Sequence, residues 1–250
     1  MNNTNNGKKE WFKEWFDSPY YHILYENRDN NEVKIFIDNL ADYFGFKKGE
    51  KVLDLACGKG RYSVYLNKLG LNVIGLDLSA HNIAFANQFE NRSLHFFKHD
   101  MREPYDVCCF EYVLNLFTSF GYFDTSEENE KAVCAAARAL KPGGQFMIDF
   151  LNPYKVIHHL IPEGIKTARG IVFKLRRYVK DGYIIKDIRF EDKGRQYHFR
   201  EKVKAIRRVE FLKYFKSAHL DLVDIFGNYE LNPYEKGESE RMIFVLNKNS

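Results

Sequence analysis

The sequence lacks any long apolar segment. No apolar run approaches the roughly 20 residues that cross a bilayer, and the longest runs have only the length of a strand. The first residues, Met1 to Glu10, are polar and hold no apolar core of the kind found in a secretory leader. We therefore expect a cytoplasmic protein that does not use a membrane.

Cysteine is scarce, and its spacing is not that of a metal site. No pair has the C-x2-C pattern typical of zinc ligands, and we find no other cluster of metal-ligating residues. We expect reduced, mostly buried thiols and no metal. The four cysteines are Cys57, Cys108, Cys109 and Cys134.

Excess charge of one sign is also small. The chain has 38 Lys and Arg against 34 Asp and Glu, a net charge of +4, which is a weak argument for nucleic-acid binding. The basic residues nevertheless concentrate between residues 174 and 208. With 45% hydrophobic and 16% aromatic residues the chain is not disordered. Its 250 residues suffice for one large domain with a sub-domain.

Strands and helices alternate through the middle of the chain. This pattern predicts a parallel sheet with helices on both of its faces. Ser79 has the right chemistry to cap the second of these helices. The expected strands are 51–55, 72–76, 94–97, 106–110 and 144–150, and the expected helices are 61–69, 79–90 and 126–140.

The two flanks of this pattern differ from it. Aromatic residues at helical spacing over 11–46 predict two helices, broken near Asp17 to Pro19 and ended by Gly45 or Gly49. Beyond Pro162 the strands 170–180, 182–192 and 195–205 predict an antiparallel meander, with Asp181-Gly182 and Lys193-Gly194 as hairpin turns. A helix over 208–218 and closing strands at 220–226 and 242–246 end the chain.

The strongest chemical signal is the run from Val52 to Ser63. A strand leads through Asp54 into a turn with Gly58 and Gly60, and a helix follows. Ligands of open parallel sheets bind at such a turn, and glycine lets the backbone approach them. The glycine pattern typical of dinucleotide-binding turns is matched only in part. The negative charge of Asp54 also disfavours the pyrophosphate of such a cofactor. A ligand with a cationic group fits this turn better.

Further polar residues follow the next strands of the sheet. Asp77 ends the second strand, where a carboxylate can accept both hydroxyls of a ribose. Asp100 and Met101 follow the third strand and suit the amine and the face of an adenine. The segment from Asn115 to Tyr122 follows the fourth strand, so all four elements share one edge of the predicted sheet.

Together these segments resemble the class I S-adenosylmethionine-dependent methyltransferases. The matching pieces are 54–60, 75–79, 100–102, 115–122 and 140–144. The resemblance implies a three-layer α/β sandwich around a Rossmann-like, mostly parallel sheet of seven strands with the last strand antiparallel. It also implies S-adenosylmethionine as cofactor and S-adenosylhomocysteine as product.

The resemblance assigns cofactor contacts residue by residue. The turn after the first strand would hold the methionine end of the cofactor. Residues that follow the second and third strands would bind its ribose and its adenine, and residues that follow the fourth strand would flank the sulfonium. Tyr21, in the aromatic amino-terminal segment, is a further candidate. These residues are Tyr21, Asp54, Ala56, Cys57, Gly58, Gly60, Asp77, Leu78, Asp100, Met101, Asn115 and Leu116.

A looser resemblance points to small-molecule N-methyltransferases of the amino-sugar or glycine type. It rests on the loop from Ser119 to Tyr122, the aromatic amino terminus and the meander. It divides the chain into a helical cap (1–46), a cofactor-binding domain (47–161 and 206–250) and a meander lid (162–205). We expect a monomer or a homodimer.

The methyl acceptor is far less defined than the cofactor. We expect methyl transfer to a nitrogen or oxygen of a small molecule, and the candidate catalytic residues are Tyr122, Asn152, His158 and Tyr229. Cys57 is expected to be structural. An RNA- or tRNA-modifying enzyme using the basic meander, a non-catalytic cofactor-binding protein and a nicotinamide dehydrogenase remain as alternatives.

Overall fold

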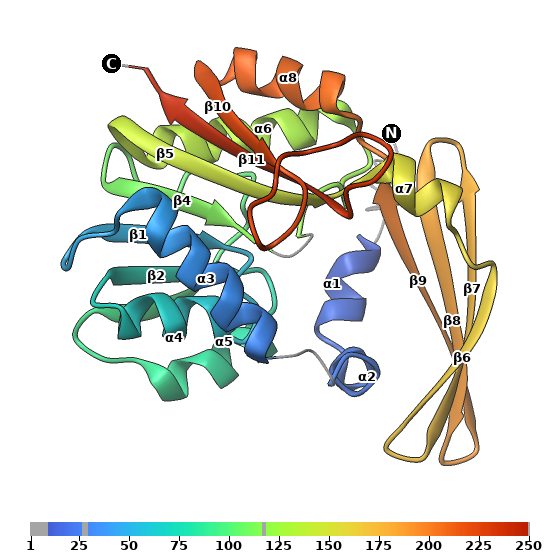
Figure 1. Cartoon of the computed structure of the whole chain (residues 1–250). Coiled ribbons are helices and arrows are strands. Elements are labelled where there is room, and N and C mark those ends of the chain that lie inside the picture. The colour runs from blue at the N-terminus through green and yellow to red at the C-terminus, as the bar shows by residue number, and fades with distance from the viewer. Residues whose placement is uncertain (1–9, 27–29, 117–118, 250) are drawn as a thin grey trace, which may run out of the picture.

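Two β-sheets organise the chain (Figure 1). The computed structural model describes residues 10–26, 30–116 and 119–249, so residues 1–9 of the polar tail and residues 117 and 118 of the predicted loop lie outside the described part. In that part, no helix has the length and apolar character needed to span a bilayer.

The larger sheet has seven strands in the order β10-β11-β5-β4-β1-β2-β3. Strand β11 runs antiparallel to both of its neighbours, whereas β1 to β5 pair in parallel. The predicted α/β fold with an antiparallel last strand is therefore confirmed. The strands are β1 (Lys51–Leu55), β2 (Asn72–Asp77), β3 (Leu94–Lys98), β4 (Phe110–Asn115), β5 (Leu140–Leu151), β10 (Leu220–Phe226) and β11 (Arg241–Lys248).

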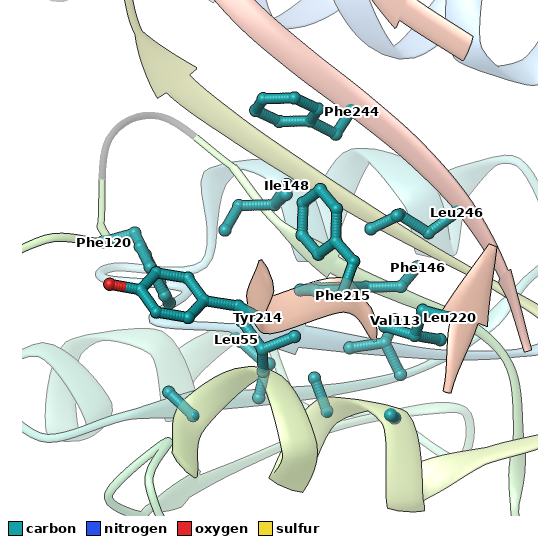
Figure 2. Packing of buried hydrophobic residues seen from close by; sticks show 14 of the residues in the cluster. Leu55, Val113, Phe120, Phe146, Ile148, Tyr214, Phe215, Leu220, Phe244 and Leu246 are labelled. Atoms are coloured by element: carbon teal, nitrogen blue, oxygen red, sulfur yellow. The ribbon is translucent and has the colours of Figure 1, made fainter. Parts of the chain in front are cut away.

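Helices cover both faces of this sheet, and each face has its own apolar core. On one face, Phe215 and Phe244 meet edge to face with their ring centroids 5.2 Å apart, between a helix and the sheet (Figure 2). That face carries α6 (Ser126–Ala139) and α8 (Arg208–Ser217). The opposite face carries α3 (Asn30–Phe44), α4 (Arg61–Lys68), α5 (Ala80–Ala86) and the short 3₁₀ helix η1 (Asn87–Phe89).

The smaller sheet is an antiparallel meander of four strands. They are β6 (Glu163–Ala168), β7 (Ile171–Lys180), β8 (Tyr183–Asp192) and β9 (Arg195–Lys204). Asp181-Gly182 and Lys193-Gly194 both have positive φ at their two positions, as two-residue hairpin turns require. Strand β6 was not predicted because Glu163–Ala168 has few apolar side chains and is only partly buried; its hairpin turn to β7 is Arg169-Gly170, again with positive φ.

Two short helices lie between the two sheets (Figure 1). They are α1 (Trp11–Phe16) and α2 (Pro19–Leu24), and Trp15 and Leu24 are buried against the meander. The long helix α3 instead packs on the large sheet, because Phe36, Ile37 and Leu40 form its apolar face. Three helices therefore stand where two were expected. The exact domain boundaries stay a prediction.

Several predicted bounds are wrong in an instructive way. The fourth strand begins at Phe110 and not at Asp106, because Cys108 has a left-handed backbone (φ +53°) that no strand accommodates. Cys108 is also exposed, so the expectation of mostly buried thiols fails there and holds for Cys57. The fifth strand starts at Leu140, earlier than expected. Helix α7 (Pro153–His158) follows it.

Candidate active site

One large cavity lies at the carboxyl ends of β1 to β4. It measures about 880 Å³, within the range of 300–1,000 Å³ that small-molecule sites occupy. Residues after β1, β2 and β3 line one side of it, α1 and α2 line another, and Arg169 reaches it from the meander. The edge predicted from the sequence is thus enclosed by two further parts of the chain.

The turn after β1 carries unusual backbone geometry. Ala56 has φ +56°, a left-handed conformation that is costly for a residue with a side chain and that clusters at functional sites. Gly58 lines the cavity, and a Cβ there would meet no atom within 4 Å. Gly60 has another role, because a Cβ would come within 2.7 Å of the Phe96 ring. Gly60 does not line the cavity and lets α4 pack closely on the sheet.

Asp54 is an acid held in an almost water-free setting. Its side chain is 1% exposed and accepts a hydrogen bond of 2.5 Å from the Ser63 hydroxyl. Burial, reinforced by the charge of nearby Asp77, raises the pKa of Asp54 to about 7 from its usual 3.8. In the part of the chain that the structure describes, no cation is paired with Asp54. A cationic ligand group would favour its ionised form.

Asp77 is oriented by the backbone around it. It accepts hydrogen bonds from the Gly58 N–H at 3.0 Å, from the Ser79 N–H at 2.8 Å and from the Asn82 amide at 3.2 Å. Burial raises its pKa, although these donors act in the opposite direction. The carboxylate therefore joins the first turn to the start of α5 and still lines the cavity.

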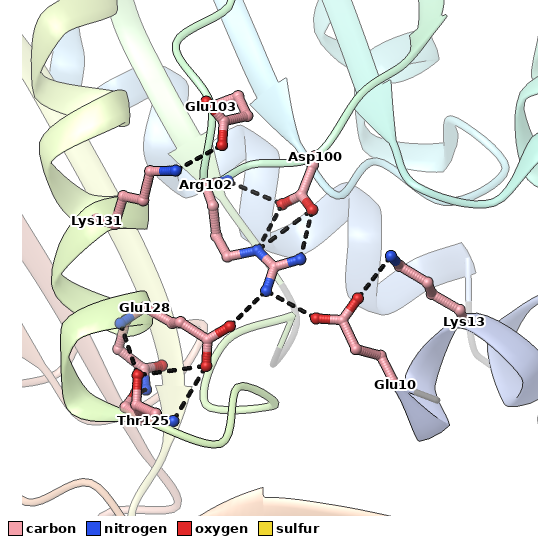
Figure 3. Close-up of polar contacts among 9 residues, drawn as sticks. Glu10, Lys13, Asp100, Arg102, Glu103, Thr125, Glu128 and Lys131 are labelled. Atoms are coloured by element: carbon pink, nitrogen blue, oxygen red, sulfur yellow. Dashed lines mark hydrogen bonds and ion pairs between the residues drawn. The ribbon is translucent and has the colours of Figure 1, made fainter. Parts of the chain in front are cut away.

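Asp100 lines the cavity, but its carboxylate is engaged by an arginine. Arg102 binds it through its backbone N–H and its guanidinium, with the shortest contact at 2.6 Å. The same guanidinium also contacts Glu10, ahead of α1, and Glu128, in α6 (Figure 3). Arg102 keeps the pKa of Asp100 below its usual value. The adenine side of the predicted site is thus fastened to the amino-terminal segment.

A second contact fastens that segment to the cavity. Asp17, between α1 and α2, accepts hydrogen bonds from the Ser79 hydroxyl at 2.6 Å and from the His81 N–H at 3.2 Å. Ser79 also caps α5, as predicted. From the sequence, Asp17 was only part of a predicted helix break. Asp17 and Ser79 lie 62 positions apart in the sequence, and only the fold brings them into contact.

Unpartnered polar atoms support a polar ligand in this cavity. The Asn82 carbonyl oxygen, the Tyr62 hydroxyl and one Arg61 guanidinium nitrogen are buried and lack a hydrogen-bond partner among the described residues. All three residues line the cavity. Such atoms are costly when left unpaired. The combination of two acids, donors and acceptors fits a ligand that carries cationic, hydroxyl and amine groups.

The comparison with known families decides the class of this site. Residues 53–148, from within β1 to within β5, match the profile of the methyltransferase domain family. This segment of the chain is a methyltransferase domain. The match agrees, at the level of this domain, with the resemblance to class I S-adenosylmethionine-dependent methyltransferases.

Curated relatives of the methyltransferase domain act on different acceptors. A putative methyltransferase of a Geobacillus species is 26% identical over 162 residues, 64% of this chain and 63% of its own length. The dTDP-3-amino-3,4,6-trideoxy-α-D-glucopyranose N,N-dimethyltransferase of Streptomyces venezuelae is 32% identical over 103 residues, 41% and 43%. A mitochondrial ubiquinone biosynthesis O-methyltransferase of Rattus norvegicus is 32% identical over 133 residues, 50% and 38%. The chain thus spans less than two thirds of each.

Solved structures share the fold over nearly the whole chain. An S-adenosylmethionine-dependent methyltransferase from Clostridium acetobutylicum has a TM-score of 0.78 at 21% identity, covering 92% of this chain and 96% of its own. CalS10, an amino pentose methyltransferase from Micromonospora echinaspora solved with S-adenosylmethionine bound, has a TM-score of 0.68 at 20% identity, covering 89% and 93%. These likenesses establish a shared fold.

The cavity gathers most of the predicted cofactor residues of the methyltransferase domain. Gly60 and Asn115 lie behind it. Asn115 is 1% exposed and donates a hydrogen bond to the Leu55 carbonyl at 2.9 Å, which joins the ends of β4 and β1. The predicted residues that line the cavity are Tyr21, Asp54, Ala56, Cys57, Gly58, Asp77, Leu78, Asp100, Met101 and Leu116. Burial raises the pKa of Cys57, so its thiol stays protonated.

Of the four catalytic candidates, the fold brings only Tyr122 to the cavity. Its ring lies among Trp11 and Phe16, with centroids 5.4 Å and 5.2 Å away. Asn152 is fully buried and caps α7, so its side chain serves the backbone there. His158 is exposed at the end of α7 and does not line the cavity.

Tyr229, the fourth candidate, belongs to a buried cluster outside the cavity. Its hydroxyl donates to Asp149 at 3.0 Å, and Asp149 also accepts from Arg241 at 2.5 Å. Burial and the charge of Asp149 raise the pKa of Tyr229. Phenol, acid and guanidinium therefore join the loop after β10 to β5 and β11.

No described group of three or more His, Cys, Asp or Glu side chains has the arrangement of a metal site.

Proposed function

We propose that this chain is an S-adenosylmethionine-dependent methyltransferase that acts on a nitrogen or oxygen of a small molecule by in-line displacement. The observation that carries the proposal is the cavity at the sheet edge, with Asp54 and Asp77 buried in its wall. A site with two buried acids suits a ligand that brings positive charge and hydroxyl groups. S-adenosylmethionine, when bound, supplies a methyl group on a positively charged sulfur.

The residues of this chain would hold the two ends of that cofactor. Asp54 and the Gly58 turn would meet its cationic methionine end, and Asp77 would accept its ribose hydroxyls. Leu78 and Met101 would cover its adenine. Because methyl transfer needs donor and acceptor aligned about 3 Å apart and shielded from water, the enclosing helices α1 and α2 take part by excluding solvent.

The acceptor shares the same cavity in this proposal. Phe16, Tyr21 and Tyr122 give it an aromatic wall, and Arg169 and Glu26 contribute polar groups. A cavity closed on one side by α1 and α2 fits a small molecule better than a polynucleotide. The amino-sugar methyltransferases among the relatives and neighbours support a nitrogen acceptor, and the O-methyltransferase relative keeps oxygen as the alternative.

The RNA-modifying alternative has less support. The meander carries exposed basic side chains such as Lys174, Arg176 and Arg189, but of the described residues lining the cavity only Arg169 belongs to the meander. A nucleic acid on those bases would not reach the cavity through them. A non-catalytic protein remains a distinct outcome, which binding without turnover would identify.

Calorimetric titration with S-adenosylmethionine, S-adenosylhomocysteine and NAD tests the proposal. We expect micromolar binding of both sulfur nucleosides and none of NAD. Asp77→Ala should weaken the binding at least tenfold, because it removes the acceptor of Gly58, Ser79 and the ligand hydroxyls. Asp221→Ala, an exposed acid on β10, is the matched control. Absence of binding by the folded wild-type protein would refute the proposal.

A further inference from the structure

A buried acid on the inner face of the meander has an unusual set of donors. Glu201 in β9 accepts a hydrogen bond from the Trp15 indole at 2.8 Å and bonds from the Tyr25 hydroxyl to both carboxylate oxygens, at 2.7 and 2.9 Å. Only 17% of its side chain is exposed. The helices α1 and α2 therefore converge on this one carboxylate.

A lysine completes the cluster from the neighbouring strand. Lys186 in β8 pairs with Glu201 across the ladder, and their charged groups are 3.4 Å apart. Its ammonium also donates to the Tyr25 hydroxyl and lies 4.7 Å from the centroid of that ring. Arg177 of β7 and Lys166 of β6 face it as like charges. Burial first, and these like charges in addition, lower the pKa of Lys186.

Tyr25 connects this cluster with the cavity. Tyr25 lines the cavity, whereas Glu201 and Lys186 lie behind it and do not. Tyr25 is thus a residue of the cavity wall whose hydroxyl is bonded to an acid and a base behind that wall. The Tyr229 and Asp149 cluster, by contrast, lies outside the lining.

We propose that Tyr25, backed by Glu201 and Lys186, forms the subsite for the acceptor's amine and removes the proton that this amine loses. This inference rests on the proposed methyltransferase function and narrows its acceptor to a nitrogen. Tyr25 is the catalytic residue, because it would touch the amine. Glu201 and Lys186 are positioning residues that act through it.

The proton balance of the step follows from the contacts. The acceptor nitrogen forms a bond to the methyl carbon while the carbon–sulfur bond of the donor breaks, and its electron pair stays on sulfur. For that bond to form the nitrogen needs its lone pair, so an acceptor that arrives as an ammonium must first lose one proton. That proton passes to the Tyr25 oxygen as the Tyr25 hydroxyl proton passes to Glu201. Lys186 keeps the carboxylate and the phenol in place during the transfer.

The outer face of the same sheet offers a matched control. There Asp187 accepts from the Tyr178 hydroxyl at 3.2 Å and from the Arg200 guanidinium at 2.7 Å. This is again a tyrosine, an acid and a cation on paired strands, but none of the three lines the cavity. Tyr178→Phe and Asp187→Asn therefore change the same chemistry away from the site.

The experiment compares Tyr25→Phe and Glu201→Gln with these two controls. The probes are S-adenosylmethionine with 3-amino-3-deoxyglucose, glycine or putrescine, each beside its hydroxyl counterpart (glucose, glycolate or butanediol). Release of S-adenosylhomocysteine is followed against pH. We expect transfer to an amine and not to its counterpart, and a fall in kcat of about a hundredfold in both variants, as for loss of a general base.

Two further readouts separate a catalytic from a merely structural role. Glutamine retains the acceptor for Trp15, so Glu201→Gln should stay folded and bind S-adenosylhomocysteine within twofold of wild type. Its pH–rate profile should differ from that of the wild type, whereas the control variants keep the wild-type profile and stay within twofold in kcat.

Three results would overturn the inference. They are methylation of hydroxyl probes with the amines inert, undiminished kcat in Tyr25→Phe and Glu201→Gln, and no transfer to any amine by a protein that binds S-adenosylmethionine. Failure of the wild-type protein to bind the cofactor would be a separate result. It would refute the proposed function itself.

Discussion

The two sheets hold acids at or behind the wall of the same cavity in opposite ways. At the edge of the large sheet, Asp54 is buried beside hydroxyl and backbone groups, with no cation paired to it among the described residues. On the small sheet, Glu201 is buried with Lys186 on the neighbouring strand. A positive charge on the ligand would pair with Asp54, whereas Glu201 is already paired with Lys186. The first region suits binding of a cationic cofactor, and the second suits proton transfer.

The arginine cluster shows how these two regions are held together. Arg102 joins the loop after β3 to Glu10 and Glu128, and Asp17 joins α5 to the segment between α1 and α2. Both contacts link the large sheet to the amino-terminal helices. The same helices contact Glu201 through Trp15 and Tyr25. The two sheets therefore reach one another through α1 and α2.

The largest expected effect comes from removing the acid that lacks a partner. Asp54→Asn should weaken S-adenosylmethionine binding by about a hundredfold, because a charge pair buried with the ligand is lost. The same variant should raise the unfolding midpoint of the free protein at pH 8, because the buried negative charge disappears. Calorimetry and thermal unfolding measure the two effects. Lower affinity without higher stability would contradict this view of Asp54.

The pH dependence of the wild type sharpens the same point. Because the folded pKa of Asp54 is raised to about 7, its contribution to stability is complete below its unfolded value of 3.8 and is lost as the pH rises through 7. Cofactor binding needs the ionised form, so affinity should fall about tenfold per pH unit below 7. Asp54→Asn should flatten both trends.

A smaller effect is expected from the contact between the two regions. Arg102→Met removes the one cation that three carboxylates share, and we expect a loss of about 2 kcal/mol in the free energy of unfolding. That corresponds to a midpoint lower by about 4–8 °C. Limited proteolysis should cut near α1 earlier than in wild type. Lys13→Met, which removes an exposed partner of Glu10, should change the midpoint by less than a degree or two.

The smallest effect is expected on the outer face of the meander. Arg176→Gln combined with Arg189→Gln removes two exposed bases, and methyl transfer to a small amine should stay within twofold of wild type. Filter binding of tRNA at low and high salt provides the second readout. A strong, salt-dependent affinity that the double variant loses would favour the RNA-modifying alternative.

Local sequence signals were sufficient for much of the large sheet. The turn with Gly58, the cap at Ser79 and the hairpins at Gly182 and Gly194 depend on neighbours a few residues away, and each was predicted from them. The fourth strand was predicted to begin too early, because the apolar pair Cys108 and Cys109 is typical of strand residues. Strand β6 was missed because its residues, Glu163–Ala168, include few apolar side chains.

The sequence by itself determined the order of the strands and helices, the edge at which the site lies and its class, because apolar periodicity and turn chemistry act over short distances. Only the tertiary structure decided which side chains meet there. Asn152, His158 and Tyr229 follow the right strands, yet they lie outside the cavity, whereas Tyr25 and Arg169 line it and Glu201 lies directly behind Tyr25. Contacts across more than a hundred residues, such as Tyr25 with Glu201, depend on how the two sheets pack around α1 and α2, and no local pattern records that packing.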